Sequence, residues 1–334
     1  MISALLTAIV HHADRIPERA ARWAFTRAAD FVWLLHLGSV SQLERNLRHV
    51  MGPVSHKRLR QVSREGLRSY FAYFCEALTV GGRSQEELLA RIRTEGTGFP
   101  EPSLSNIKDA SLPIAMGHQG NWDYAGFWAG QALGPVTTVA ERLADPQLLE
   151  DFAQIRRGLG MHILLTGQPG LTQTLTQQVL QEGQVVPLLA DRDLSRNGVF
   201  VRAFDSYIRV AAGPAVIALD AKLPLYTVNM HRESLATDKR SQAHCDSGYV
   251  CSIDGPIDIE RYLAMPRQQA VQELTQAWVD QWAEGIRKFP QDWHMMQPIF
   301  IEDLDLNRLH QVPDNLRQLM EERAASTTAR NQHE

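Results

Sequence analysis

Hydrophobic positions recur at helical spacing through the first third of the chain. From residue 17 to residue 35, apolar side chains return every three or four positions, and the arginines of this stretch lie largely off the apolar stripe. Similar patterns cover residues 41–49, 55–78 and 85–93, and a loop rich in glycine and proline follows them. We therefore expect residues 1–95 to form an all-helical N-terminal subdomain.

From residue 111 onward, short apolar runs alternate with longer helical patterns. Strands are expected at residues 112–116, 136–139, 161–165, 185–189, 199–201 and 225–228. Helices are expected at residues 122–133, 146–159, 171–181, 213–221 and 266–288. This alternation predicts an α/β fold over residues 96–310, with a central mixed sheet flanked by helices. The polar tail, residues 320–334, is expected to be disordered.

The composition supports a folded globular protein and an uneven charge. Of the 334 residues, 44% are hydrophobic and 22% are charged, and the net charge is −4. Residues 1–80 contain 11 Lys or Arg against 6 acidic residues, a local excess of +5, so the remainder sums to −9. The overall charge gives no support for a nucleic-acid partner, whereas the basic N-terminal part is compatible with an anionic membrane surface.

Cysteine content and hydropathy exclude several classes of protein. The three cysteines, Cys75, Cys245 and Cys251, are too few and too irregularly spaced for a disulfide scaffold or a structural zinc site, and they fit a reducing cytoplasm. We expect no secretory signal, and no apolar run approaches the ~20 residues of a membrane span. Trp23 and Phe31 on the first helix either dock on the rest of the protein or lie in a membrane interface.

The run Gly117-His118-Gln119-Gly120-Asn121-Trp122-Asp123 carries the clearest chemistry, because it follows an expected strand and opens an expected helix. If Asp123 folds back onto His118, it orients the imidazole and leaves the other ring nitrogen to take a proton from a hydroxyl. Gly120 and Asn121 lie in the turn, where a helix N-terminus stabilises developing negative charge. No Ser or Cys nucleophile is present in the run, which favours direct transfer to a hydroxyl. The alternative is a turn histidine followed by a capping aspartate.

This run resembles the His-x4-Asp/Glu signature of the bacterial lipid acyltransferases that include the lauroyl and myristoyl transferases of lipid A synthesis. Aspartate in place of glutamate, together with residues 138–143, 190–194 and 290–295, is similar to the actinobacterial branch, the phosphatidylinositol mannoside acyltransferases. The resemblance covers roughly residues 15–305.

The resemblance implies a peripheral enzyme on the cytoplasmic face of the plasma membrane. Such an enzyme moves a long acyl chain from acyl-CoA to a mannose hydroxyl of a phosphatidylinositol mannoside, with no metal, no other cofactor and no covalent acyl-enzyme. We expect a monomer. Two alternatives remain open: an acyltransferase that takes its acyl group from acyl carrier protein to a lipid A-type precursor, and a non-catalytic lipid-binding protein of the same fold.

Further candidate residues follow from the resemblance. Arg156 and Arg209 match positions expected to hold a phosphate-bearing ligand, with a solvated cation and a structural ion pair as the respective alternatives. The other substrate-binding candidates are Glu141, Arg142, Asp191, Arg192 and Asp193, for which a local salt bridge or a polar turn is the alternative. Phe200 stands where many relatives of this branch carry an acidic residue that supports the histidine, and Trp293 and His294 are expected mainly to pack.

Overall fold

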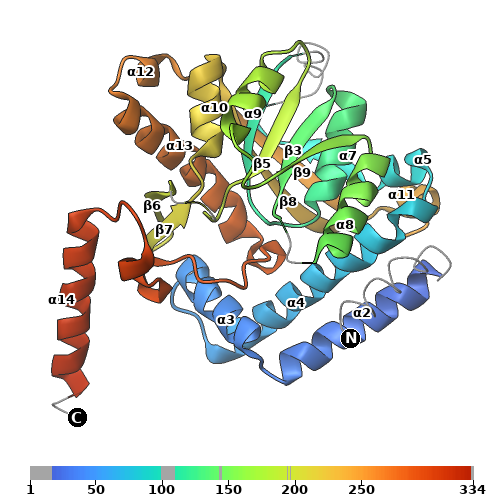
Figure 1. The fold of residues 1–334 in the computed structure, drawn as a ribbon. Coiled ribbons are helices and arrows are strands. Elements are labelled where there is room, and N and C mark those ends of the chain that lie inside the picture. The colour runs from blue at the N-terminus through green and yellow to red at the C-terminus, as the bar shows by residue number, and fades with distance from the viewer. Residues whose placement is uncertain (1–16, 99–109, 143–144, 194, 196, 332–334) are drawn as a thin grey trace.

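The structure is a computed structural model that describes residues 17–98, 110–142, 145–193, 195 and 197–331 (Figure 1). Its centre is a mixed sheet of seven strands in the order β1-β9-β8-β2-β5-β3-β4, in which only the β8–β9 pair is antiparallel. These strands are β1 (Ile92–Glu95), β2 (Leu112–Met116), β3 (Val136–Ala140), β4 (Met161–Leu165), β5 (Val185–Leu189), β8 (Leu225–Ser234) and β9 (Ser247–Ile257). A separate antiparallel hairpin consists of β6 (Val199–Ala203) and β7 (Ser206–Val210).

Helices cover both faces of the sheet (Figure 1). One face packs against α5 (Gln85–Ala90), α7 (Trp122–Ala132) and α8 (Pro146–Gly158). The other packs against α9 (Leu171–Val179), α10 (Gly213–Ala221) and α13 (Arg267–Lys288), whose Trp278 and Trp282 are fully buried. Two short helices, α11 (Thr237–Ala243) and α12 (Glu260–Leu263), complete this part. The helix starts follow local chemistry: the Asp145 carboxylate caps α8, where Pro146 occupies the first turn.

Three N-terminal helices lie beside the sheet layers and reach the site described below. They are α2 (Glu18–Leu34), α3 (Gly38–Met51) and α4 (His56–Thr79), and α4 packs against both of the others. Leu43, Leu47 and Leu67 form the centre of their shared core. In the part of the chain that the structure describes, no helix is both long enough and apolar enough to cross a membrane.

The sequence pattern predicted the architecture and most of its elements. The helical N-terminal region and the mixed sheet flanked by helices are confirmed. The six expected strands and five expected helices appear within a few residues of their predicted bounds, except that β8 continues six residues beyond its expected end at residue 228. Strands β1, β7 and β9 were not predicted. Because β1 pairs with β9, residues 92–95 belong to the sheet and not to the helical subdomain.

The structure has a helix over residues 320–331 of the tail for which disorder was predicted. Helix α14 (Asp314–Asn331) continues through it, and Val312 and Leu316 pack against Phe200 and Ile301 at its base. The apolar contacts at this base are not evident from the polar composition of residues 320–331. Residues 1–16 of the predicted helical subdomain, and the last three residues, lie outside the described part of the chain.

Candidate active site

The site forms where three neighbouring parallel strands end. His118 follows β2, Asp191 and Arg192 follow β5, and Glu141 follows β3. In the sheet β2 pairs with β5, with Met116 opposite Leu189, and β5 also pairs with β3. Residues from distant parts of the sequence therefore meet at one edge of the sheet, the position at which α/β folds place their binding sites.

Asp191, and not Asp123, is the carboxylate that holds the catalytic candidate His118. The Nδ1 atom of His118 lies 2.6 Å from Oδ1 of Asp191, and the backbone N–H of His118 donates to Oδ2 at 2.9 Å. The indole N–H of Trp293 donates to the same Oδ2 at 3.0 Å. Burial alone would raise the pKa of Asp191, but His118 and these hydrogen bonds outweigh it and hold the pKa below its usual value. With Nδ1 engaged, Nε2 is the ring nitrogen left for a substrate.

Asp123 has different partners, which corrects the expectation that it orients His118. Its Oδ1 accepts from Nε of Arg156 at 2.8 Å, and its Oδ2 accepts from the Tyr73 hydroxyl at 3.0 Å. Asp123 lies in the first turn of α7, five residues after His118, so it points to α8 and α4 and leaves the histidine to a residue from the neighbouring strand. The expectation from sequence spacing failed because β2 pairs with β5, which brings Asp191 next to His118.

The Gly120 N–H and the Asn121 side chain shape the turn and have partners within the protein, so these two groups are not free to stabilise an oxyanion. The Gly120 N–H donates to the Asp292 carbonyl at 2.8 Å. Its φ of +60° and the nearness of Met230, 2.9 Å from any added Cβ, explain the glycine. The Asn121 side chain caps α7 by accepting from the Tyr124 N–H and donates to Glu76 at 2.9 Å. Both residues therefore have structural roles in the turn.

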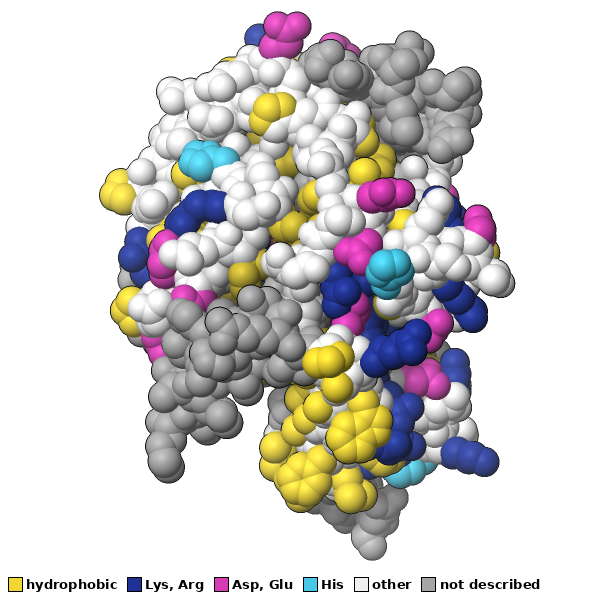
Figure 2. All heavy atoms as spheres, turned by 90° about the vertical axis from the view of Figure 1, so that its right-hand side faces the viewer, with side chains coloured by type: hydrophobic (Ala, Val, Ile, Leu, Met, Phe, Trp, Pro, Cys, Tyr) yellow, Lys and Arg dark blue, Asp and Glu magenta, His cyan; other side chains and the backbone are white. Residues whose placement is uncertain are grey.

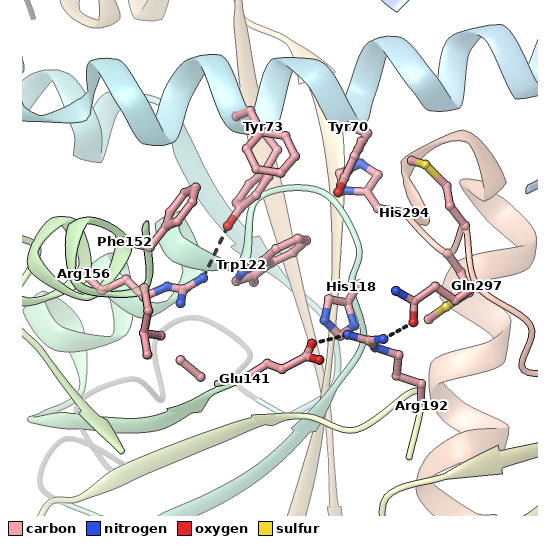
Figure 3. A pocket seen from close by; sticks show the side chains of 15 residues that line it. Tyr70, Tyr73, His118, Trp122, Glu141, Phe152, Arg156, Arg192, His294 and Gln297 are labelled. Atoms are coloured by element: carbon pink, nitrogen blue, oxygen red, sulfur yellow. Dashed lines mark hydrogen bonds and ion pairs between the residues drawn. The ribbon is translucent and has the colours of Figure 1, made fainter. Parts of the chain in front are cut away.

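A pocket of about 250 Å³ opens in front of His118 (Figure 3). Helix α4 contributes Tyr70, Tyr73 and Phe74 to its wall, and α8 contributes Phe152 and Arg156. The remaining lining residues are Trp122, Ala140, Glu141, Leu149, Arg192, His294, Met295, Met296 and Gln297. Four of the candidates from the sequence, His118, Glu141, Arg156 and Arg192, therefore line the same pocket.

Two smaller cavities continue from His118 into the interior. The first, of about 110 Å³, is lined by apolar and charged side chains, with His118, Trp122, Asp123 and Arg156 among them. The second, of about 20 Å³, is apolar and shares Met116, Gly126 and Pro187 with the first. The smaller cavity lies between α7 and the sheet and is lined almost wholly by apolar residues. The catalytic candidate therefore stands between a partly polar mouth and an apolar interior.

The acidic and basic candidates at the mouth pair with each other. Arg192 forms an ion pair with Glu141 and a hydrogen bond with Gln297, as the dashed lines in Figure 3 show. Arg142 is exposed, and its backbone N–H donates to the Thr166 hydroxyl at 3.0 Å. It does not line the pocket.

Arg209 and Asp193 form the structural ion pair that the sequence left open. Nη1 of Arg209 lies 2.7 Å from Oδ2 of Asp193, and both side chains are buried. Neither residue lines the pocket or the two inner cavities, so the expectation that Arg209 meets a phosphate there is not supported. Phe200 packs in the apolar cluster at the base of α14. The resemblance led us to expect an acidic residue at position 200 that supports the histidine, and Asp191 provides this carboxylate instead.

Tyr70, Tyr73 and His294 are pocket residues that the sequence analysis did not select as such. The spacing of Tyr70, Tyr73 and Phe74, three and four residues apart on one face of a helix, is the sequence signal that could have found the two tyrosines. Within the described ranges, no group of three or more histidine, cysteine or acidic side chains could hold a metal ion.

Comparison with known proteins decides the family. A family model described as bacterial lipid A biosynthesis acyltransferase matches residues 2–301. The chain belongs to this family. A phosphatidylinositol mannoside acyltransferase of Mycolicibacterium smegmatis is 32% identical over 296 residues, covering 88% of this chain and 89% of the relative. One of Mycobacterium tuberculosis is 30% identical over 300 residues, covering 89% and 88%.

As a member of the lipid A biosynthesis acyltransferase family, the protein is an acyltransferase. The comparisons confirm the family resemblance that we inferred from residues 117–123, 138–143, 190–194 and 290–295.

Proposed function

We propose that this acyltransferase moves a long acyl chain from acyl-CoA to a mannose hydroxyl of a phosphatidylinositol mannoside at a membrane surface. The observation that carries the proposal is the position of His118, tied to buried Asp191 between a partly polar pocket and an apolar interior. The names of the relatives support the choice of acceptor.

His118 acts as the general base. Its Nε2 takes the proton of the acceptor hydroxyl while the hydroxyl oxygen bonds to the thioester carbon, and Asp191 stabilises the imidazolium that forms. When the carbon–sulfur bond breaks, the imidazolium returns the proton to the departing thiolate of CoA. The acyl group passes directly to the acceptor, so no covalent acyl-enzyme forms and no metal is required.

Arg156 and Asp123 support the site from the α8 side. Asp123 and Tyr73 fix the guanidinium of Arg156, which lines both the pocket and the first inner cavity. Burial lowers the pKa of Arg156, but Asp123 and Tyr73 more than offset this, so the side chain stays charged. A fixed cation here suits the phosphate of the donor or acceptor.

The apolar interior accommodates the acyl chain of the donor. Gly126 of α7 stands at the junction of the two inner cavities, and a Cβ atom added there would lie 2.3 Å from Sδ of Met161. Gly126→Ala therefore forces the flexible Met161 side chain to move within the cavity that it lines. Because each buried methylene contributes about 0.8 kcal/mol, loss of this space weakens binding of long chains most.

We expect Gly126→Ala to shift the preference of the enzyme from long to shorter acyl-CoA substrates, measured as kcat/KM over a series of chain lengths. Gly130→Ala is the matched control, since it lies one turn later on α7 and its added Cβ would meet its nearest neighbour at an ordinary 3.9 Å. A chain-length profile that is the same in both variants and in the unmodified protein would refute this placement of the chain.

The outer face of α2 is the surface proposed to meet the membrane. Trp23, Phe31 and Leu34 are between 61% and 69% exposed, and their spacing places them on one side of the helix. Arg27 lies over the Trp23 ring, 5.9 Å from its centroid. Figure 2 shows this apolar patch with Lys and Arg side chains along its edge, a combination typical of helices that lie in an anionic interface.

The double variant Trp23→Ala/Phe31→Ala is expected to bind anionic vesicles at least tenfold more weakly, because both aromatic rings are lost from the interface. Co-sedimentation with vesicles measures this, and Leu180→Ala, which removes a residue 58% exposed on another helix end, is the control. Binding of the unmodified protein should also fall with added salt, which screens charges over ~8 Å or less. Equal binding by the double variant and the control would contradict the assignment.

The proposed reaction is tested by supplying radiolabelled palmitoyl-CoA or palmitoyl-acyl carrier protein with either mannosylated phosphoinositides or lipid A precursors. We expect label in the mannosylated lipid, and from acyl-CoA. Label only in a lipid A precursor would replace the proposed acceptor, and no product from any pair would indicate a lipid-binding protein of this fold.

A further inference from the structure

His294 holds its imidazole in one tautomer. Its Nε2 lies 3.0 Å from the Ser69 hydroxyl, and that hydroxyl donates to Oδ1 of Asp292 at 2.7 Å. A hydroxyl has a single proton, so Ser69 accepts from His294 if it donates to Asp292. The other oxygen of Asp292 accepts from the Arg232 N–H at 3.1 Å. Burial raises the pKa of Asp292, and the hydrogen bonds from Ser69 and Arg232 oppose this shift by stabilising the carboxylate. The proton of His294 is therefore on Nε2.

The second nitrogen of His294 is then a bare acceptor. Burial lowers the pKa of His294 to about 3, with a further contribution from the nearby His118, so the ring is neutral near pH 7. Its Nδ1 is enclosed and has no hydrogen-bond partner among the described residues, although the side chain is only 7% exposed. A buried acceptor without a donor is unfavourable and is rare in folded proteins.

The imidazole ring that carries this enclosed acceptor forms part of the wall of the pocket that contains His118. His294 lines that pocket, and its backbone N–H donates to the His118 carbonyl at 2.8 Å, which fixes the two residues relative to each other. Its ring lies 5.4 Å from that of Tyr70 and 5.9 Å from that of Trp122, measured between centroids. Figure 3 shows His294 beside Tyr70, on the α4 side of His118.

We propose that Nδ1 of His294 accepts a hydrogen bond from a hydroxyl group of the acceptor, and that Ser69 and Asp292 are positioning residues that keep this nitrogen unprotonated. The inference rests on the proposed function, because it concerns how the acceptor is selected at the same site. A nitrogen with a lone pair and no proton binds O–H donors and offers nothing to the oxygens of a phosphate or carboxylate. His294 thus selects a sugar or polyol hydroxyl, while the arginines at the pocket serve anionic groups.

The tautomer can be measured without turnover, from the ¹⁵N resonances of histidine-labelled protein, with the His294 signals identified by their loss in His294→Asn. We expect Nδ1 in the unprotonated range, and we expect it to move toward the protonated range at saturating methyl α-mannopyranoside. Ser69→Ala removes the hydrogen-bond partner of Nε2, so part of the His294 population should then carry its proton on Nδ1. A protonated Nδ1 in the unmodified protein, or one that the mannoside does not move, overturns the inference.

Kinetics distinguish a role in binding from a role in packing. His294→Leu is expected to raise KM for the glycolipid acceptor about tenfold, the effect of one lost hydrogen bond. His294→Asn, whose side-chain oxygen lies near the position of Nδ1, should recover most of this loss. His231→Leu is the control, because His231 is equally buried, stacks on Phe289 and does not line the pocket.

Equal KM values in all three variants, or equal increases in all three, would overturn the proposed role of His294. If the protein acylates no mannosylated lipid but Nδ1 responds to the mannoside, the proposed reaction fails and the inference about His294 stands.

Discussion

Replacing His118 with alanine is expected to lower the rate of acyl transfer by a factor of about 10² to 10⁴, the usual contribution of a general base. A sugar hydroxyl does not ionise near neutral pH, so its proton must leave as the new bond forms. His118 is 24% exposed in its side chain and faces the pocket, whereas its partner Asp191 is buried. Because the change removes no part of the apolar interior, binding of acyl-CoA should persist.

Single-turnover transfer measures this loss, with circular dichroism and donor binding as controls for folding. A rate close to that of the unmodified enzyme in a folded His118→Ala variant would show that another group takes the proton.

Asp191→Asn is expected to cause a loss of similar size. The amide cannot stabilise the imidazolium and can hold His118 in the wrong tautomer, and the corresponding change in serine hydrolases lowers kcat by about 10⁴. Asp123→Asn is the matched control, since it makes the same chemical change to a carboxylate held by Arg156 and Tyr73.

The rates of double variants show which of the two aspartates acts together with His118. Asp191→Asn should add nothing to the loss in His118→Ala, because both changes disable one unit, whereas the effect of Asp123→Asn should couple to that of Arg156→Gln. Single-turnover rates of the double variants provide the measurement. If Asp123→Asn is silent in the His118→Ala background and Asp191→Asn is additive there, Asp123 supports the histidine after all.

The fold was predictable because four strands of the sheet, β2, β3, β4 and β5, are short runs of five mostly apolar residues. Residues 112–116 and 185–189 match β2 and β5 without any shift of their bounds. Strand β9, which was not predicted, differs from these strands in its composition. Strand β9 contains Asp254, Gly255 and Pro256, which favour turns, and its pairing with β8 on one side and β1 on the other makes it a strand.

The sequence indicated several residues that line the pocket, His118, Glu141, Arg156 and Arg192, but not how the candidate side chains pair. The motif identified His118, and the position of Asp191 after a buried strand made it a candidate. The sequence does not state strand order, and the contact of His118 with Asp191 depends on β2 lying next to β5. Asp123 was chosen as partner because it was close in the chain. Arg209 was a candidate phosphate ligand because of the resemblance, and its contact with buried Asp193 is the structural ion pair that had been the alternative.

The central claim is direct transfer from donor to glycolipid hydroxyl through His118, and intact-mass measurement during a single turnover tests it most directly. Protein in excess over labelled acyl-CoA is mixed with a mannosylated phosphoinositide, and the masses of protein and lipid are followed together. We predict that label appears in the lipid while the protein mass stays unchanged throughout. A protein species heavier by one acyl group that forms first and disappears as product appears would contradict the account.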